Sequence, residues 1–380
     1  PKKIKDRPDA EASAEVVAWL AARLREGEAE RMARRDRVSY HRLTREEYVH
    51  TLRDLIGVQY DATDPGGLPE DPEWNGFERI GSVLTLSPTH VEKYVRAAEV
   101  ALDEAYPEEK VEYLEASRRA VVITEQQHRH HYHRLKEAGL LEKARYEITT
   151  HGEIFRGSNP YRDGLKFPGP GVYEISYVVS GLKPENGKAP RMQVYEHKLD
   201  RILFEQDVVA SEEEPVTVTF RTHFPDVRSP SLHVLNLSGP RRHPRTNSRS
   251  RIPFISTKHP RAPWQMKITD REGKPRYPVL ILDSLSIRGP IVTEREQRLR
   301  DEYMPDEDTL EAARKGLAAM ARRAFRRPLY EGEPDTYLRI VESELAAGEK
   351  FRDAVKSAMT AILCSKSFLY LSEGDENADR

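Results

Sequence analysis

Arginine is the residue type whose placement points most clearly to chemistry in this chain. The 380 residues hold 61 Lys and Arg against 63 Asp and Glu, yet the stretch from Val227 to Thr269 has nine basic residues and no acidic one. Guanidinium groups bind sulfate, carboxylate and phosphate because paired N–H donors meet paired oxygens. The stretch is therefore predicted to grip an acidic polysaccharide, through three arginines above all: Arg241, Arg245 and Arg249. The alternative is a solvated loop that neutralises the glutamate-rich helices.

Aromatic residues supply the other half of a sugar site, because flat rings stack on the apolar faces of pyranoses. Tyr161, Phe254 and Trp264 each follow a proline in a loop-like segment, and they are predicted to be carbohydrate contacts. Other tyrosines alternate within strand-like runs and are expected to pack in the core or across strands: Tyr173, Tyr177 and Tyr195. The predicted sugar site therefore combines arginines with rings that lie outside the strands.

Four histidines crowd into the short stretch from His128 to His133, at positions 128, 130, 131 and 133. Imidazoles three residues apart face the same way on a helix, and such an arrangement binds transition metals. Polar and basic residues surround them, and no carboxylate or cysteine stands at a ligand-like spacing. Adventitious nickel binding is therefore expected rather than a biological metal centre.

Linear catalytic motifs are absent. The sequence has no G-x-S-x-G elbow, Walker loop, dinucleotide glycine pattern or H-E-x-x-H, so acyl transfer, nucleotide use and zincin chemistry lose their usual support. A paired-carboxylate glycosidase stays open, because two acids that folding brings together leave no linear trace. The single cysteine, Cys364, excludes an intrachain disulfide and is expected to be a small buried apolar residue.

Apolar patterning divides the chain into three zones of an α+β multidomain protein. Residues 1–145 are predicted to form an N-terminal helical domain, residues 146–292 a β-sandwich and residues 293–380 a C-terminal helical domain. The middle zone holds short alternating runs between Gly, Pro and Asn, which indicates an antiparallel sandwich or jelly roll. Neither helical part offers much core alone, so the sandwich is expected to be inserted between helical parts that pack together. No run approaches the roughly 18 apolar residues of a membrane span.

Capping residues mark the expected helices. Thr44 and Glu47 form a predicted capping box, and Gly57 is placed to end that helix in a left-handed conformation. The helix has one apolar face: Tyr48, Leu52, Leu55 and Ile56. Ser87-Pro88 begins a second helix, whose apolar face is predicted to contain Val91, Tyr94, Val95 and Ala98. Between them, the Trp74–Phe77 segment is expected to form a tight turn.

These helical stretches carry a family resemblance. The segment from His41 to Leu102 resembles the planctomycete-specific domain family, and so does Ala321–Leu329 with the following Phe351–Leu371. Members of that family are large multidomain proteins of mostly unknown function that also hold c-type haem segments. The resemblance implies a periplasmic or cell-surface protein with haem on neighbouring domains, the last of them ending just before Pro1. This chain lacks C-x-x-C-H, so no haem is expected within it.

The middle zone is similar to jelly-roll carbohydrate-binding modules of the galactose-binding-like type. The similarity rests on Gly171-Val172-Tyr173, on Val194–Lys198 and on Leu282–Ile287. Many such modules hold a structural calcium ion near the first and last strands. The resemblance implies a calcium site with three carboxylate ligands: Glu147, Glu153 and Asp283. The alternative is that these carboxylates are solvated at strand ends.

Together these features predict a non-catalytic binding and scaffold segment of a larger exported haem protein. Its sandwich is expected to bind a polysaccharide, and its other partners to be the neighbouring haem domains. One alternative is a part of an enzyme that oxidises or hydrolyses polysaccharide, and another is a purely structural spacer between domains. Nucleic acid is not an expected partner, because the chain lacks a basic surface of matching extent.

Overall fold

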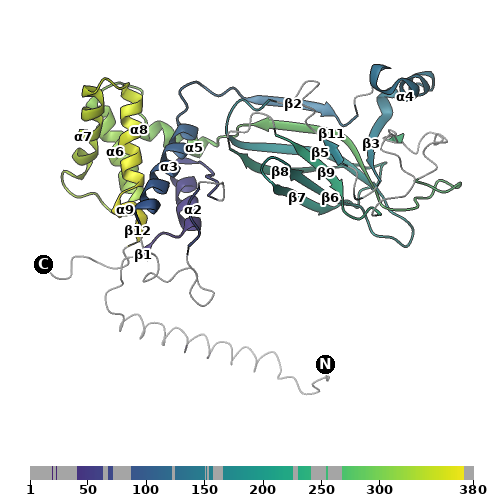
Figure 1. The fold of residues 1–380 in the computed structure, drawn as a ribbon, viewed down its shortest axis with the longest axis horizontal. Coiled ribbons are helices and arrows are strands. Elements are labelled where there is room, and N and C mark those ends of the chain that lie inside the picture. Colours follow the sequence, from purple (N-terminus) through teal and green to yellow (C-terminus); the bar gives the residue numbers. More distant parts are fainter. Residues whose placement is uncertain are drawn as a thin grey trace.

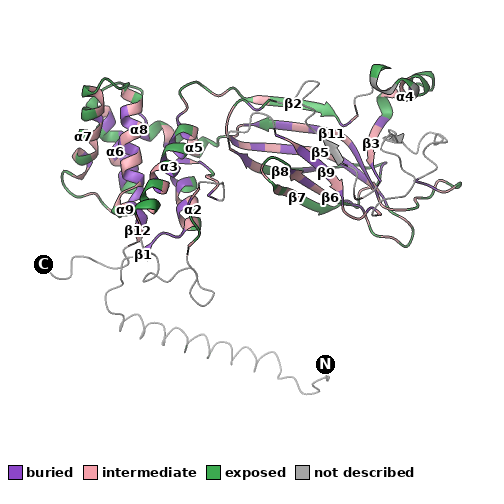
Figure 2. Cartoon of the chain, viewed as in Figure 1, coloured by how far each residue is buried: buried purple, intermediate pink, exposed green. Residues whose placement is uncertain are grey.

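The computed structural model describes residues 19, 23, 41–62, 67–71, 87–121, 125–149, 151, 154–156, 166–225, 230–240, 254–255 and 268–371. Within these ranges the chain forms a helical module and a β-sandwich that lie side by side (Figure 1). Buried residues line the contacts between helices and the space between the two sheets (Figure 2). No helix in the described ranges is long and apolar enough to span a bilayer.

The helical module is built from both ends of the chain. Its helices are α2 (Arg45–Ile56), α3 (Pro88–Ala105), α5 (Glu294–Tyr303), α6 (Leu310–Ala324), α7 (Glu333–Ala346), α8 (Phe351–Leu363) and α9 (Lys366–Leu369). A single hydrophobic cluster joins residues of α2 and α3 to residues of α5, α6 and α8. Strand β1 (His41–Arg42) also pairs antiparallel with β12 (Tyr370–Leu371). The expectation that the sandwich is inserted between two helical parts that pack together is confirmed.

Local capping explains where the first helices begin and end. Thr44 Oγ1 accepts a hydrogen bond from the Glu47 backbone N–H (3.2 Å), and Glu47 Oε2 accepts one from the Thr44 backbone N–H (2.9 Å). Gly57 ends α2 at φ 70°, a left-handed conformation that favours glycine. Ser87 caps α3 as predicted, but Val91 is 47% exposed, so the prediction that it belongs to the buried face is wrong. The buried face contains Tyr94 and Leu102 together with small residues that let α8 approach closely: Ala97, Ala98, Ala101 and Ala105.

The sandwich consists of two antiparallel sheets. The large sheet has the order β10 (Phe254–Ile255), β3 (Ala144–Ile148), β11 (Val279–Gly289), β5 (Gly171–Leu182), β8 (Val216–Phe224), with β2 (Leu114–Arg119) also paired to β11. The small sheet has the order β4 (Ile154–Arg156), β9 (Leu232–Asn236), β6 (Arg191–Glu196), β7 (Arg201–Asp207). A hydrophobic cluster fills the space between the sheets and contains the fully buried rings of Tyr173 and Tyr177, as expected.

The strand order is that of a jelly roll. When β3 to β9 and β11 are numbered one to eight along the chain, the large sheet contains strands 1-8-3-6 and the small sheet strands 2-7-4-5. This order arises when a long hairpin folds over so that successive strands alternate between two sheets. The predicted class, an antiparallel jelly roll inserted between helical segments, is therefore confirmed.

The chain joins the sandwich earlier than residue 146, where the sequence pattern places the start of the β zone. Strand β2 pairs with β11 along its whole length, from Leu114 opposite Gly289 to Arg119 opposite Ser284. Helix α4 (Glu125–Glu137) and the short 3-10 helix η1 (Leu141–Lys143) then lie between β2 and β3. Strand β2 carries three charged residues and only two apolar ones, so it has the composition of a surface loop. Pairing with a neighbouring strand, rather than hydrophobic periodicity, makes it a strand.

Gly316 allows α6 to lie against the end of α5. A Cβ atom at this position would lie 2.2 Å from the backbone oxygen of Tyr303. We expect Gly316→Ala to lower the free energy of unfolding by about 1–3 kcal/mol, because the backbones must separate, although alanine normally favours a helix over glycine by about 1 kcal/mol. Chemical denaturation followed by circular dichroism measures this. The exposed neighbour provides the control, since Lys315→Ala should change stability by less than about 0.5 kcal/mol.

Candidate functional site

The outer face of the small sheet carries the group of side chains best suited to bind a ligand. Along β6, Met192 and Val194 are fully buried, whereas Gln193 and Tyr195 alternate with them and are partly exposed. A strand turns successive side chains to opposite faces, so the second pair lies on the outer surface. Strand register then places Gln193 opposite Glu205 of β7, and Tyr195 opposite His233 of β9.

A polar network covers one half of this face. Arg191 Nε donates to Glu205 Oε1 at 2.6 Å, and its Nη1 donates to Asp207 at 2.9 Å. Gln193 Nε2 donates to the other Glu205 oxygen at 2.8 Å. The hydrogen bond from Gln193 and then that from Arg191 lower the pKa of Glu205 below its ordinary value. The network therefore presents fixed anionic acceptors and planar donors to solvent.

Three rings lie together on the other half, of which His197 is exposed, Tyr195 is partly exposed and His233 is buried, at 6% exposure. The centroids of His197 and His233 are 5.3 Å apart with the rings nearly parallel, and Tyr195 lies 6.3 Å from each of them. The Tyr195 hydroxyl donates to Asp200, and this hydrogen bond raises the pKa of Tyr195. His233 Nε2 is 3.1 Å from Ser231 Oγ. We refer to Tyr195, His197 and His233 as the ring cluster.

A buried carboxylate fixes the backbone around the ring cluster. Glu196 is fully buried, and its side chain accepts hydrogen bonds from the backbone N–H groups of Leu199 (2.6 Å) and Ser231. The first bond closes the turn between β6 and β7, and the second ties that turn to the start of β9. Because both strands that carry the rings are held at one point, the ring cluster is pre-organised rather than shaped by a ligand.

Rings beside fixed hydrogen-bonding groups make up the surface chemistry that recognises a sugar. Hydrolysis by two carboxylates would need a general acid whose pKa is raised. The pKa of Glu205 is lowered instead, because the carboxylate accepts hydrogen bonds from Gln193 and Arg191. Glu205 therefore lacks the raised pKa that a general acid needs.

The outer face of the large sheet differs in chemistry. Hydroxyl groups from four strands align across it, with Thr219 and Ser176 oxygens 2.9 Å apart and Ser286 and Ser117 oxygens 3.0 Å apart. In the next row Glu174 pairs with a guanidinium on either side, from Arg221 and Arg288. Burial pushes the pKa of Glu174 up, but these hydrogen bonds prevail and lower it. The outward-facing residues of these four strands, as far as the structure describes them, include no ring apart from His223 at the contact with the helical module.

Most of the carbohydrate contacts predicted from sequence lie outside the described residues: Tyr161, Arg241, Arg245, Arg249 and Trp264. Phe254 is described through its backbone only, in β10, where it pairs with Arg145 of β3. Its backbone therefore forms part of the large sheet. For the histidine stretch, the structure places all four residues on α4, and of these it describes only the side chain of His133. Its metal interpretation therefore stays untested.

The predicted calcium ligands are only partly described, because Glu153 lies outside the described ranges. Asp283 lies at a bulge of β11 and pairs with Arg145 Nε at 2.8 Å. Burial raises the pKa of the Asp283 carboxyl, against the effect of Arg145 and Arg119. Glu147 lies two strand positions from Arg145, opposite Ile281. A guanidinium thus contacts Asp283, one of the three predicted ligands. Among the described residues no group of three His, Cys, Asp or Glu could hold a metal ion. Because Glu153 is not one of these residues, the calcium site stays a prediction.

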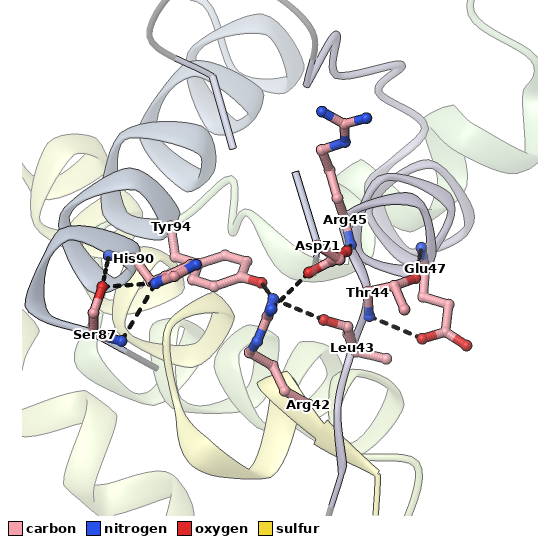
Figure 3. A network of polar contacts seen from close by, with 9 residues as sticks. All are labelled: Arg42, Leu43, Thr44, Arg45, Glu47, Asp71, Ser87, His90 and Tyr94. Atoms are coloured by element: carbon pink, nitrogen blue, oxygen red, sulfur yellow. Dashed lines mark hydrogen bonds and ion pairs between the residues drawn. The ribbon is translucent and has the colours of Figure 1, made fainter. Parts of the chain in front are cut away.

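A second polar centre lies in the helical module (Figure 3). Arg42 is 2% exposed and donates to Asp71 (2.6 Å), to the Tyr94 hydroxyl (2.5 Å) and to the backbone oxygen of Leu43 (3.1 Å). Asp71 also accepts the backbone N–H of Arg45 at 2.5 Å. The two terminal nitrogens of the guanidinium bind protein groups, whereas the buried Arg42 Nε has no hydrogen-bond partner in the described part of the chain. The centre therefore joins β1, α2 and α3.

Two family models match segments of the chain that form the helical module. Residues 41–107 match the family model PSD3, a protein of unknown function (DUF1587). Residues 312–373 match the model PSD5, also a protein of unknown function (DUF1595). The first match covers α2 and α3, and the second covers most of α6 together with α7, α8 and α9, whereas α5 lies outside both. No curated protein matches the chain.

Two solved structures are similar to the jelly roll. One is the C-terminal CBM6 of LamC from Zobellia galactanivorans, at 13% identity and TM-score 0.22, with 37% of this chain and 75% of that chain covered. The other is the carbohydrate-binding module CBM6cm-2 of Cellvibrio mixtus lichenase 5A, solved in complex with cellotriose. It is 9% identical, at TM-score 0.21, with 38% of this chain and 85% of that chain covered.

Sequence reasoning missed the ring cluster, although a partial signal was present. Tyr195 and His197 alternate with Val194 and Glu196, which places both on one face of a strand. His233 lies 38 positions further along the chain by residue number, and only the register between β6 and β9 brings it opposite Tyr195. Composition pointed to the arginine-rich and proline-flanked segments as the sugar site. Composition carries no information about strand register, so it could not predict the ring cluster.

Proposed function

We propose that this chain is a non-catalytic binding and positioning segment whose jelly roll binds carbohydrate through the ring cluster. The observation that best supports this proposal is the position of three rings, one on β6, one in the turn after β6 and one on β9. They lie beside the network of Arg191, Gln193 and Glu205. A pyranose presents an apolar face and a rim of hydroxyl groups, which match a ring surface and fixed polar groups respectively. The helical module, built from both ends of the chain, provides the frame that carries the jelly roll.

The wider setting that we propose follows from the resemblance described for the sequence. In it, the chain is part of a larger exported protein, periplasmic or at the cell surface, with haem on neighbouring domains as its partners. The polysaccharide is then positioned by this segment, while other domains carry out any chemistry. An oxidative or hydrolytic enzyme to which this segment contributes part of the active site is the alternative, and a structural spacer is the third reading.

A glycan array with the purified chain tests the proposal. We expect binding to at least one glycan, and we expect Tyr195→Ala to weaken it about tenfold or more, a loss of ~1.4 kcal/mol. Tyr195→Phe keeps the ring and should retain affinity within about threefold. Isothermal titration with the best glycan of the array provides the affinities.

The matched control is Tyr113→Ala, which removes an exposed tyrosine from the connection between α3 and β2. It should bind like the unaltered chain. Sulfated and uronic-acid polysaccharides on the array, together with an Arg241→Ala, Arg245→Ala, Arg249→Ala variant at low and high salt, separate the basic segment from the ring cluster. Absence of binding to every glycan, or full binding by Tyr195→Ala, would contradict the proposal. Release of reducing ends from a bound glycan would favour the enzyme instead.

A further inference from the structure

Two polar contacts connect the helical module to the jelly roll. Glu104, in the last turn of α3, lies 2.8 Å from His223 near the end of β8, and these side chains are only 10% and 8% exposed. Asp61, which follows α2, pairs with Arg201 at the start of β7 at 3.0 Å. We call these four residues the latch.

The two pairs of the latch are coupled on the jelly-roll side. Arg201 Nη2 donates to the backbone oxygen of His223 at 2.6 Å, so one guanidinium contacts both a carboxylate of the helical module and the strand that carries the imidazole. Glu104 also interacts electrostatically with Arg300 of α5. Each half of the latch therefore helps to hold the other half in place.

The latch differs from the rest of the molecule in the force that holds it. The helical module and the jelly roll each have their own hydrophobic cluster, and in the described part of the chain the two clusters share no residue. Apolar interfaces resist opening because separation exposes hydrocarbon to water, whereas separated charges regain hydration. Domains joined through small polar interfaces are expected to move relative to one another. A polar latch therefore suits a contact that opens without exposing a core.

Two chain connections cross between the parts beside the latch. One runs from Tyr106, directly after α3, to β2, and the other runs from β11 to α5. The first begins two residues after Glu104. The connections provide the covalent link about which the jelly roll would turn, and the latch residues are positioned to prevent that turn.

We propose that the latch is a conformational device that fixes the orientation of the jelly roll on the helical module and releases it when both of its pairs are broken. In the closed state a ligand on the jelly roll is held at a defined place relative to the helical module. In the open state the jelly roll remains folded and tethered but rotates about its two connections.

Distance measurement between spin labels on the two parts tests the latch in the full chain. The labels are placed at Val209→Cys on the jelly roll, where Val209 is 85% exposed, and at the exposed Ser343→Cys on α7. Burial raises the pKa of the natural Cys364 thiol to about 12, so this thiol reacts far more slowly than the introduced ones. We expect one narrow distance distribution, and a distribution at least twice as broad after Arg201→Ala with His223→Ala.

A variant with its substitutions in the helical module distinguishes release of the latch from damage to the jelly roll. Asp61→Ala with Glu104→Ala breaks the same two pairs from the helical module and should broaden the distribution to the same extent. Arg221→Ala is the control, because it removes an ion pair of β8 that faces Glu174 and not the helical module. A narrow distribution in both latch variants, or a broad one in the unaltered chain, would overturn the proposal. Unchanged thermal unfolding of the jelly-roll strands in the variants would show that both parts stay folded.

Discussion

Deletion of residues 293–380 is expected to unfold the N-terminal helices while the jelly roll stays folded. Helices α2 and α3 bury their apolar faces against α5, α6 and α8, and β1 has its strand partner in β12. The 12 residues of α2 are close to the length below which an isolated helix is marginal, and the longer α3, with 18 residues, owes most of its stability to packing of its apolar face. The jelly roll keeps its own core between its two sheets.

Hydrogen exchange measured by mass spectrometry distinguishes the two outcomes along the chain. Amides of α2 and α3 should lose their protection, whereas those of β5 and β11 should keep it. Supplying residues 293–380 as a separate chain provides the control, because protection of α2 and α3 should return when the core is completed. Retained protection of α2 and α3 in the truncated chain alone would contradict the shared core.

Asp71→Ala is expected to lower the free energy of unfolding of the helical module by about 3–5 kcal/mol, because it leaves the Arg42 guanidinium buried without its counter-charge. Arg42 and Asp71 are 2% and 6% exposed, so solvent replaces little of the lost interaction. The same change also removes the acceptor for the Arg45 backbone N–H. Chemical denaturation followed by far-ultraviolet circular dichroism measures the loss.

A surface pair in the same module provides the control for this prediction. Arg53 and Asp54 are both about half exposed or more and lie 3.4 Å apart, so Asp54→Ala should cost at most about 1 kcal/mol. Arg42→Met combined with Asp71→Leu removes both charges and should be less destabilised than Asp71→Ala alone. If Asp71→Ala lowered the free energy of unfolding by less than about 1 kcal/mol, the contact between Arg42 and Asp71 in Figure 3 would not contribute to stability as predicted.

Local signals in the sequence were sufficient for the helices of the module. Thr44, Glu47, Gly57 and Ser87 act through backbone groups within a few residues of themselves, and each has the capping role that its type and spacing predict. Alternating apolar residues were likewise sufficient for β5, in which every second residue from Tyr173 to Val179 is fully buried. Such signals are readable because their partners are near in the chain.

Contacts between distant residues were not readable in the same way. Arg42 appears in the sequence as one more charged residue before a helix, yet it is buried because Asp71 and Tyr94 lie around it after folding. Its partners are 29 and 52 positions away. Strand β2 was missed for the same reason, since only β11 supplies its hydrogen bonds.

By itself the sequence determined the composition of the parts: capped helices at both ends, alternating strands between them, and a jelly roll inserted into a helical frame. Capping, periodicity and turn chemistry are properties of neighbouring residues, and they carry over from sequence to structure. The tertiary structure alone decided that Tyr195, His197 and His233 form one cluster and that Glu104 and His223 meet between the two parts. Those juxtapositions depend on strand register and on packing of one part against another, which the energies of many distant contacts fix together.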